Sequence, residues 1–195
     1  INDTYSKHIV TIEDPVEFVH PSKKCVLSQR EVGTDSATFA TALRAAIRQD
    51  ADVILVGEMR DLETISLAIT AAEMGALVFG TLHTNSAAKT IDRVIDAFPP
   101  DQQKQVRASL SESLKGVIAQ LLMRTADGKG RAAVNEILLE APGLANMIRE
   151  GNTPMINSII TSNKKMGMQS MDDALWEKVE KGIITGEDAY LKALD

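Results

Sequence analysis

The sequence predicts an α/β protein in which a mostly parallel β-sheet is flanked by helices and followed by a small helical subdomain. Short apolar runs, typical of buried strands, alternate with longer amphipathic segments, typical of helices. The segments between these runs are long enough for βαβ crossovers, which make neighbouring strands parallel and are right-handed. We therefore expect helices on both faces of the sheet. After Pro142 the strand signals stop and short helical segments follow.

Three strands are expected in the first half of the chain. Residues 9–12 form a β-branched run, and residues 53–56 and 77–79 are short and continuously apolar. Residues 18–30 have a mixed composition and contain or follow prolines, so we expect a hairpin-like excursion there.

Helices are expected between these strands. In residues 36–48, apolar side chains recur every four positions, and Asp35 or Ser36 is available as the N-cap. The next helix begins after Asp61, and a third begins after Ser86.

The second half starts with a predicted long helix after Pro99 and Pro100. Its apolar face is formed by residues spaced three to four apart, namely Val106, Leu110, Leu114, Val117 and Leu121. A turn at 127–130 precedes a possible last strand at 132–139.

Short helices with clear boundary signals fill the C-terminal part. Ser170 and Thr185 are each followed three residues later by Asp, which resembles a capping box, and Gly151, Gly167 and Gly182 stand where helices could stop. We therefore divide the chain into a sheet-containing part at 1–140 and a helical subdomain at 141–195.

Composition excludes several classes of protein. The 195 residues carry 21 basic and 27 acidic side chains, and the net charge of −6 argues against a nucleic-acid partner. One cysteine excludes a disulfide framework and a cysteine-based zinc site within one chain. No apolar run approaches the roughly 18 residues that a membrane span needs.

Polar side chains follow each predicted strand, at the edge where ligands bind in parallel sheets. Any one of them could be an ordinary surface acid, turn residue or structural histidine, but together they suit a hard cation and a polyphosphate. The candidates are Glu13, Asp14 and Glu17 after the first strand, Glu58 after the second, and His83 and Thr84 after the third.

Three arginines could contact phosphate near these residues. Arg44 and Arg48 are four residues apart and share a helix face, and Arg60 follows Glu58 by two positions. They could equally form ion pairs with nearby acids. The phosphate-binding pattern G-x-x-x-x-G-K-[ST] does not occur in the sequence.

Three ordered motifs resemble those of the secretion ATPase superfamily. Residues 11–17 (TIEDPVE) resemble its Asp box, residues 52–61 (DVILVGEMRD) its Walker B segment, and residues 80–85 (GTLHTN) its His box. Within the superfamily, residues 98–103, 109–114 and 144–151 resemble the type IV pilus retraction branch. The isolated Cys25 also favours this branch, because extension and type II secretion ATPases usually carry a tetracysteine zinc subdomain.

The resemblance implies a RecA-like P-loop ATPase core at 1–140, truncated at its N-terminus, in a hexameric motor that uses ATP and Mg²⁺ to drive pilus retraction. It implies that Glu13 orients or deprotonates the attacking water, that Glu58 supports Mg²⁺ through water, and that His83 contacts the γ-phosphate. Arg44, Arg48 and Arg60 would contact phosphate at or near a subunit interface, with Asp14, Glu17 and Thr84 beside the nucleotide.

The implied location is the cytoplasmic side of the inner membrane. The implied partners are a membrane platform protein and other pilus ATPases. Because the chain opens on Ile1 like the end of a helix, we expect a P-loop upstream and no ATPase activity in this piece alone. A pilus assembly or type II secretion ATPase, or a non-catalytic interaction fragment, remains an alternative.

Overall fold

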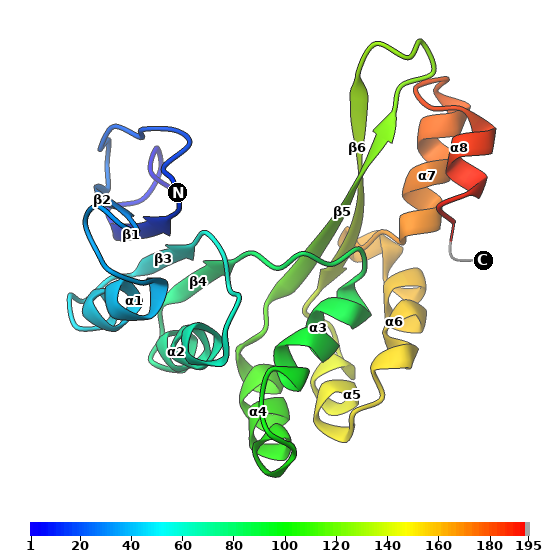
Figure 1. Ribbon diagram of the computed structural model, residues 1–195. Coiled ribbons are helices and arrows are strands. Elements are labelled where there is room, and N and C mark those ends of the chain that lie inside the picture. Colours follow the sequence, from blue (N-terminus) through cyan, green and yellow to red (C-terminus); the bar gives the residue numbers. More distant parts are fainter. Residues whose placement is uncertain (194–195) are drawn as a thin grey trace. The chain divides into compact units, whose positions relative to one another are not determined.

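The computed structural model describes residues 1–193, which form two compact units, Ile1–Leu82 and a second unit that begins at His83 (Figure 1). The hairpin at 116–139 packs with helices that follow residue 141, so it belongs with them in the second unit. The predicted boundary between an ATPase core at 1–140 and a helical subdomain at 141–195 stays a prediction. Among residues 1–193, every helix is too short or too polar to traverse a bilayer.

The first unit is a four-stranded parallel sheet in the order β2-β1-β3-β4. Its elements are β1 (His8–Glu13), β2 (Val26–Glu31), α1 (Phe39–Ile47), β3 (Val53–Val56), α2 (Leu62–Glu73) and β4 (Leu77–Gly80). The expected strands at 9–12, 53–56 and 77–79 are confirmed.

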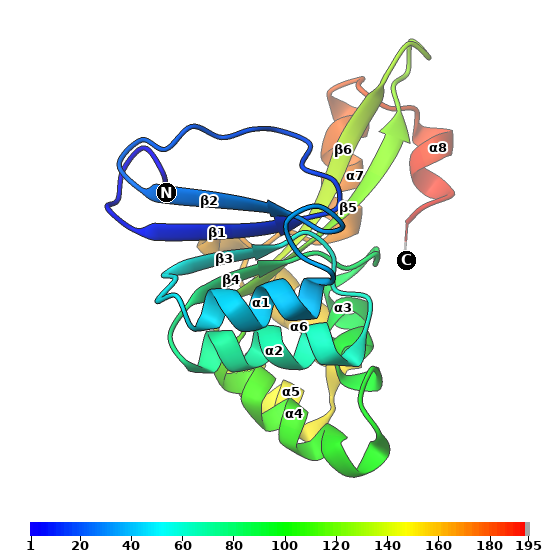
Figure 2. The same cartoon turned by 60° about the vertical axis from the view of Figure 1, so that its left-hand side comes forward.

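Both helices of this unit lie against one face of the sheet (Figure 2). Val10, Ile12 and Ile54 point to this face and pack with Leu43 of α1 and Ala68 of α2 in one buried core. Within residues 1–82 the expectation of helices on both faces is wrong. The reason is that both helical crossovers proceed in the same direction across the sheet, from β2 over β1 to β3 and then to β4.

The segment at 18–30 contains a strand rather than a hairpin-like excursion. β2 runs parallel to β1 over its whole length, from the pair His8 and Val26 to the pair Glu13 and Glu31. Residues 28–31 of the strand are polar and none of its six side chains is fully buried, so the hydrophobic pattern of a buried strand is absent. That composition explains why the sequence does not reveal it.

The helix starts follow side-chain capping. Asp61 accepts a hydrogen bond from the Thr64 N–H at 2.8 Å, as expected. α1, in contrast, begins one turn later than predicted, because Thr38 and not Asp35 or Ser36 is its N-cap. The Thr38 hydroxyl accepts from the Thr41 N–H at 3.1 Å.

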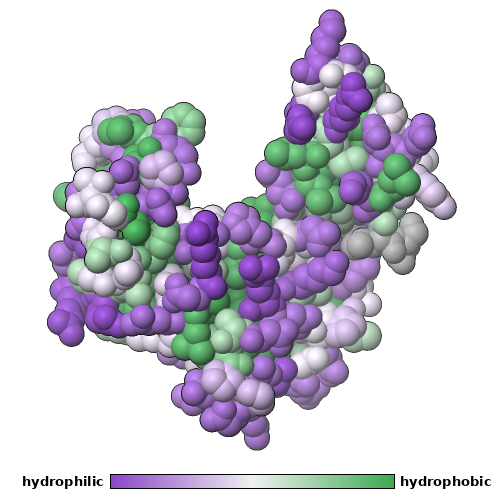
Figure 3. Space-filling model, viewed as in Figure 1, coloured by the Kyte–Doolittle hydropathy of each residue, from purple (hydrophilic) through white to green (hydrophobic). Residues whose placement is uncertain are grey.

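The second unit combines an antiparallel hairpin with helices (Figure 1). Its elements are α3 (Ala87–Asp96), α4 (Pro100–Ser113), β5 (Gly116–Arg124), β6 (Arg131–Leu139), α5 (Leu144–Glu150), the 3₁₀ turn Thr153–Met155, α6 (Ile156–Ser162), the 3₁₀ turn Lys164–Met166, α7 (Met171–Glu180) and α8 (Gly186–Tyr190). One face of the hairpin packs with α7 and α8 around Met123, Val134 and Leu175. The hairpin tip is hydrophilic (Figure 3).

The predicted long helix through Leu121 is wrong. α4 ends at Ser113, and Val117 and Leu121 belong to strand β5. Residues four apart share a face in a helix and also on a strand, so the spacing does not distinguish the two. The burial of alternate residues Val117 and Ala119 shows the period of a strand.

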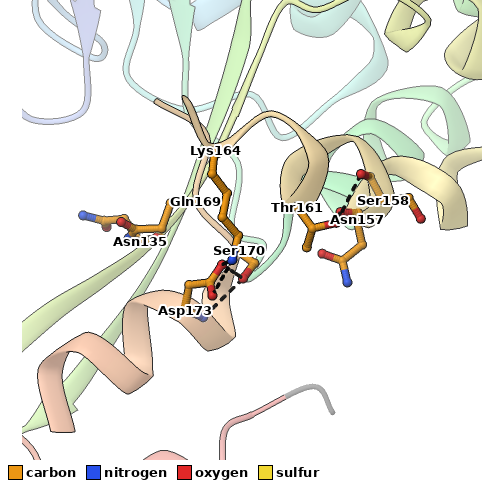
Figure 4. Close-up of polar contacts among 8 residues, drawn as sticks. All are labelled: Asn135, Asn157, Ser158, Thr161, Lys164, Gln169, Ser170 and Asp173. Carbon is orange, nitrogen blue, oxygen red and sulfur yellow. Dashed lines mark hydrogen bonds and ion pairs between the residues drawn. The ribbon is translucent and has the colours of Figure 1, made fainter. Parts of the chain in front are cut away.

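The predicted boundaries of the C-terminal helices are confirmed. The Ser170 hydroxyl accepts from the Asp173 N–H at 3.2 Å, and the Thr185 hydroxyl accepts from the Asp188 N–H at 3.1 Å. Figure 4 shows the first of these caps, where the Asp173 carboxylate also accepts from Ser170 and pairs with Lys164. Lys164, and secondly Ser170, lower the pKa of Asp173 through these hydrogen bonds.

Candidate active site

The carboxyl edge of the parallel sheet carries the acids of the predicted site. Glu13 is the last residue of β1, and Gly57 and Glu58 directly follow β3. The strands are hydrogen-bonded neighbours, and the Gly57 N–H donates to the Ile12 carbonyl at 2.7 Å. Two of the predicted catalytic acids therefore extend from adjacent strand ends.

The Glu58 carboxylate lies beside Arg60, a residue that is predicted to contact phosphate. Its side chain is only 18% exposed, and Oε2 lies 2.5 Å from Nη2 of Arg60, whose own side chain is 72% exposed. The hydrogen bond to Glu58, then the charges of Glu58 and Asp14, raise the pKa of Arg60 above its ordinary value. Arg60, Glu58 and Asp14 thus form one electrostatic group at the strand ends.

A close backbone approach explains the glycine before Glu58. A Cβ atom at Gly57 would lie 2.9 Å from the Ile12 carbonyl oxygen and 3.2 Å from the Glu13 Cα. Both of those atoms belong to the backbone of β1 and cannot rotate away. Gly57 therefore lets β1 and β3 meet where they present Glu13 and Glu58.

Two neighbouring side chains, neither found from the sequence, hold the Glu13 carboxylate. The Thr11 hydroxyl donates to Oε1 of Glu13 at 2.5 Å, and the Gln29 amide donates to the same oxygen at 3.0 Å. Strand alternation around Glu13 could have indicated Thr11. Gln29 could have been found only once β2 had been identified as a strand beside β1.

Glu31 is a further acid of this edge that sequence reasoning did not place in the site. Its carboxylate accepts from the Val16 N–H at 3.0 Å and from the Thr34 hydroxyl at 3.3 Å. It therefore anchors the connection that leaves β1. Glu17, a predicted site residue on that same connection, is exposed and makes no hydrogen bond or ion pair within residues 1–193.

Arg44 and Arg48 are not brought to the acids within this unit. Arg44 forms an ion pair with Glu63 of α2. Arg48 is the C-cap of α1, and four residues later the Asp52 N–H donates to the His8 carbonyl at the start of β1. The end of α1 therefore lies at the amino edge of the sheet, opposite Glu13 and Glu58.

His83 and Thr84 belong to the second unit, so their approach to Glu13 and Glu58 remains a prediction. Thr84 is tied to the start of α3. Its hydroxyl lies 2.6 Å from the Thr90 hydroxyl, which donates to the Ser86 carbonyl at 2.8 Å.

A buried acid missed by the sequence supports the same helix start. Glu136 of β6 is 3% exposed, and its Oε1 accepts from the Ala87 N–H at 2.6 Å. A carboxylate at this position satisfies an N–H that the helix leaves unpaired and interacts favourably with the helix dipole. The hairpin thereby helps to fix the beginning of α3, which the His83 segment precedes.

The donor set at the first unit's edge fits Mg²⁺ better than a transition metal. Residues 1–193 contain no cluster of three or more His, Cys, Asp or Glu side chains suited to hold a metal ion. Mg²⁺ typically takes one or two carboxylates, and water and substrate phosphate supply its other ligands. The carboxylate of Glu58 meets this requirement.

Known proteins resemble the chain over nearly its whole length. A family model described as type II/IV secretion system protein matches residues 1–191. The twitching motility protein of Neisseria gonorrhoeae is 54% identical over 193 residues, which are 99% of this chain and 52% of that protein. The type IV pilus retractation ATPase PilT of Pseudomonas aeruginosa is 55% identical, over 99% of this chain and 56% of that protein.

A solved structure agrees with these relatives. The crystal structure of the pilus retraction motor PilT with bound ADP superposes with a TM-score of 0.90 at 49% identity, and covers 100% of this chain and 55% of that one. The predicted α/β fold is therefore confirmed as that of a pilus ATPase. The chain spans about half the length of the relatives that it matches.

Proposed function

The chain belongs to the family of type II/IV secretion system proteins, and on that premise we propose that it forms the catalytic half of an ATP-hydrolysing motor for type IV pilus retraction. The adjacent placement of Glu13 and Glu58 at the carboxyl edge of a parallel sheet carries this proposal. The names of the similar proteins, a twitching motility protein and a retraction ATPase, support retraction as the direction of movement. The bound ADP of the similar structure supports a nucleotide as the ligand.

In the proposed mechanism, Glu13 accepts a hydrogen bond from the attacking water and takes its proton as the bond to the γ-phosphorus forms. The leaving group is ADP, and the reaction requires the water and the leaving oxygen to be roughly in line. Bound at Glu58 through water, Mg²⁺ would neutralise charge on the β- and γ-phosphates. Glu58 and Asp14 would hold Arg60 until an incoming phosphate competes for its guanidinium.

His83 and Thr84 would contact the γ-phosphate side of the nucleotide. For Arg44 and Arg48 we propose contact with the nucleotide of a neighbouring subunit, because within their own unit they point to Glu63 or stand at the opposite edge. Such an arginine supplied by a neighbour can accelerate hydrolysis by about 10³–10⁵. This proposal includes a homohexameric ring. The ring would work at the cytoplasmic side of the inner membrane, with a platform protein and other pilus ATPases.

The sequence contains no Walker A motif, so we propose that the 195 residues alone do not hydrolyse ATP. Calorimetric titration with Mg-ATP tests this on the isolated chain and on the full-length gene product. We expect binding only to the full-length protein. Micromolar binding of Mg-ATP to the isolated chain would show that nucleotide binding does not require a P-loop outside these residues, and would contradict the proposal.

Activity and direction need separate assays. In the full-length gene product, Glu58→Gln is expected to abolish phosphate release, whereas the control Glu73→Gln, an exposed residue at the end of α2, leaves it unchanged. Unchanged turnover in Glu58→Gln would contradict the assignment.

In a strain that lacks the gene, loss of pilus retraction with intact extension supports the retraction motor, and loss of extension supports an assembly ATPase.

A further inference from the structure

One oxygen of the Glu13 carboxylate is held by two donors and the other is left open. Oε1 accepts from the Thr11 hydroxyl at 2.5 Å and from Nε2 of Gln29 at 3.0 Å. Within residues 1–193, Oε2 makes no hydrogen bond or ion pair. A carboxylate fixed through one oxygen presents the second in a defined direction.

The register of the sheet creates this arrangement. Thr11 and Gln29 are direct partners across the parallel pair β1 and β2, and Glu13 is two residues beyond Thr11. Residues two apart on a strand share a face, so all three side chains extend from the same side of the sheet. Thr11 is 5% exposed, which requires its hydroxyl to have a partner inside the protein.

The Gln29 amide has only one consistent orientation. Its Nε2 donates to Glu13 at 3.0 Å and to the Phe18 carbonyl at 2.9 Å, and its Oε1 accepts from the His20 N–H at 2.6 Å. The reversed amide would direct an oxygen at two acceptors and an NH₂ group at a donor. Gln29 therefore connects the Glu13 carboxylate rigidly to the backbone that follows β1.

We propose that Gln29, assisted by Thr11, is a positioning residue that aims Oε2 of Glu13 at the attacking water. This inference rests on the proposed function, in which Glu13 activates that water. Gln29 does not touch the substrate; it acts through the carboxylate and through the backbone at Phe18 and His20. Misplacing a reacting group by about 1 Å can cost about 100-fold in rate, so loss of this contact affects turnover more than nucleotide binding.

The test measures steady-state ATP hydrolysis by the full-length gene product. Gln29→Met keeps the length of the side chain and removes all three hydrogen bonds. We expect kcat to fall by about 10- to 100-fold while the KM for ATP stays within about 2-fold. Gln120→Met is the matched control, because Gln120 is an exposed strand glutamine whose side chain makes no hydrogen bond among residues 1–193. Its kcat is expected to be unchanged.

Two further variants separate positioning from general stability. Thr11→Ser keeps the donating hydroxyl and is expected to retain the wild-type kcat. Thr11→Val lacks the hydroxyl and is expected to have a lower kcat, at a melting temperature similar to that of Thr11→Ser.

Wild-type kcat in Gln29→Met, or a rise of KM alone, would overturn the proposal. So would equal losses in Thr11→Ser and Thr11→Val that follow their melting temperatures. If instead the wild-type protein shows no ATP hydrolysis, or Glu13→Gln retains it, the proposed function itself fails.

Discussion

Replacing Gly57 by alanine tests the close contact between β1 and β3 on which the site depends. The new Cβ would lie 2.9 Å from the Ile12 carbonyl oxygen. Cβ atoms in proteins essentially never come closer than 3.0 Å to such an atom. Ile12 is fully buried in the core between the sheet and its helices, so its backbone has little freedom to retreat. The strands must separate locally, which also stretches the 2.7 Å hydrogen bond from Gly57 to Ile12.

The expected cost combines these two effects. Overpacking of a closely packed site costs about 1–3 kcal/mol, and weakening one backbone hydrogen bond adds about 0.5–1.5 kcal/mol. A total of about 2–4 kcal/mol lowers the melting temperature of a chain of this size by about 5–15 °C. Scanning calorimetry of this chain measures the change directly.

Gly130→Ala is the control for the same substitution without the contact. At Gly130 the nearest atom to an added Cβ is the Thr125 hydroxyl oxygen at 3.7 Å, which is an ordinary contact. Its melting temperature is expected to stay within about 2 °C of wild type. A Gly57→Ala protein as stable as Gly130→Ala would refute the inference that β1 and β3 need a glycine at this crossing.

Three further predictions concern other contacts of the chain. Glu136→Leu leaves the Ala87 N–H buried without an acceptor, and we expect the free energy of unfolding in urea to fall by about 1–3 kcal/mol. Glu136→Gln should lose much less stability, because its side-chain carbonyl can still accept this hydrogen bond. Equal losses in the two variants would argue against the cap. The lowered pKa of Asp173 means that its contribution to stability is complete above its ordinary value of 3.8 and disappears as pH falls through the lower folded-state pKa. Asp173→Asn should therefore unfold with a weaker pH dependence below about pH 4, although the exposed pair contributes well under about 1 kcal/mol. For Arg44 and Glu63, a double-mutant cycle on stability is expected to give an interaction energy of only about 0.2–1 kcal/mol. Arg44→Ala in the full-length protein is expected to reduce ATP turnover by far more than the loss of this ion pair explains. Unchanged turnover would leave Arg44 as a structural residue.

The sequence predicts those parts of the fold that depend on local signals. Asp61, Ser86, Ser170 and Thr185 are N-caps as expected, because a side-chain acceptor at a helix start acts on its own next turn. The buried strand 53–56 is equally clear, since its continuous apolar run needs a sheet covered by other elements.

Long-range pairing explains what the sequence does not predict. β2 is mostly polar and none of its side chains is fully buried, so its identity as a strand depends on its partner β1. Val117 and Leu121 have a spacing compatible with helix or strand, and pairing with β6 decides for the strand.

The candidate site divides in the same way. Glu13 and Glu58 could be predicted from the sequence, because Glu13 ends one recognisable strand and Glu58 comes two residues after the end of another. Gln29 acts on Glu13 only through sheet register, and Glu136 acts on α3 from 49 residues away, so neither role has a local sequence signal.

The ATP turnover of Glu13→Gln in the full-length gene product, measured together with its ATP affinity, tests the catalytic role of this sheet edge most directly. We predict nearly unchanged binding of Mg-ATP and loss of phosphate release, because the amide retains the shape of the side chain but cannot accept the proton of the attacking water. Phosphate release at the wild-type rate, with ATP bound equally well, would contradict the claim that the carboxyl edge of this sheet is the catalytic centre.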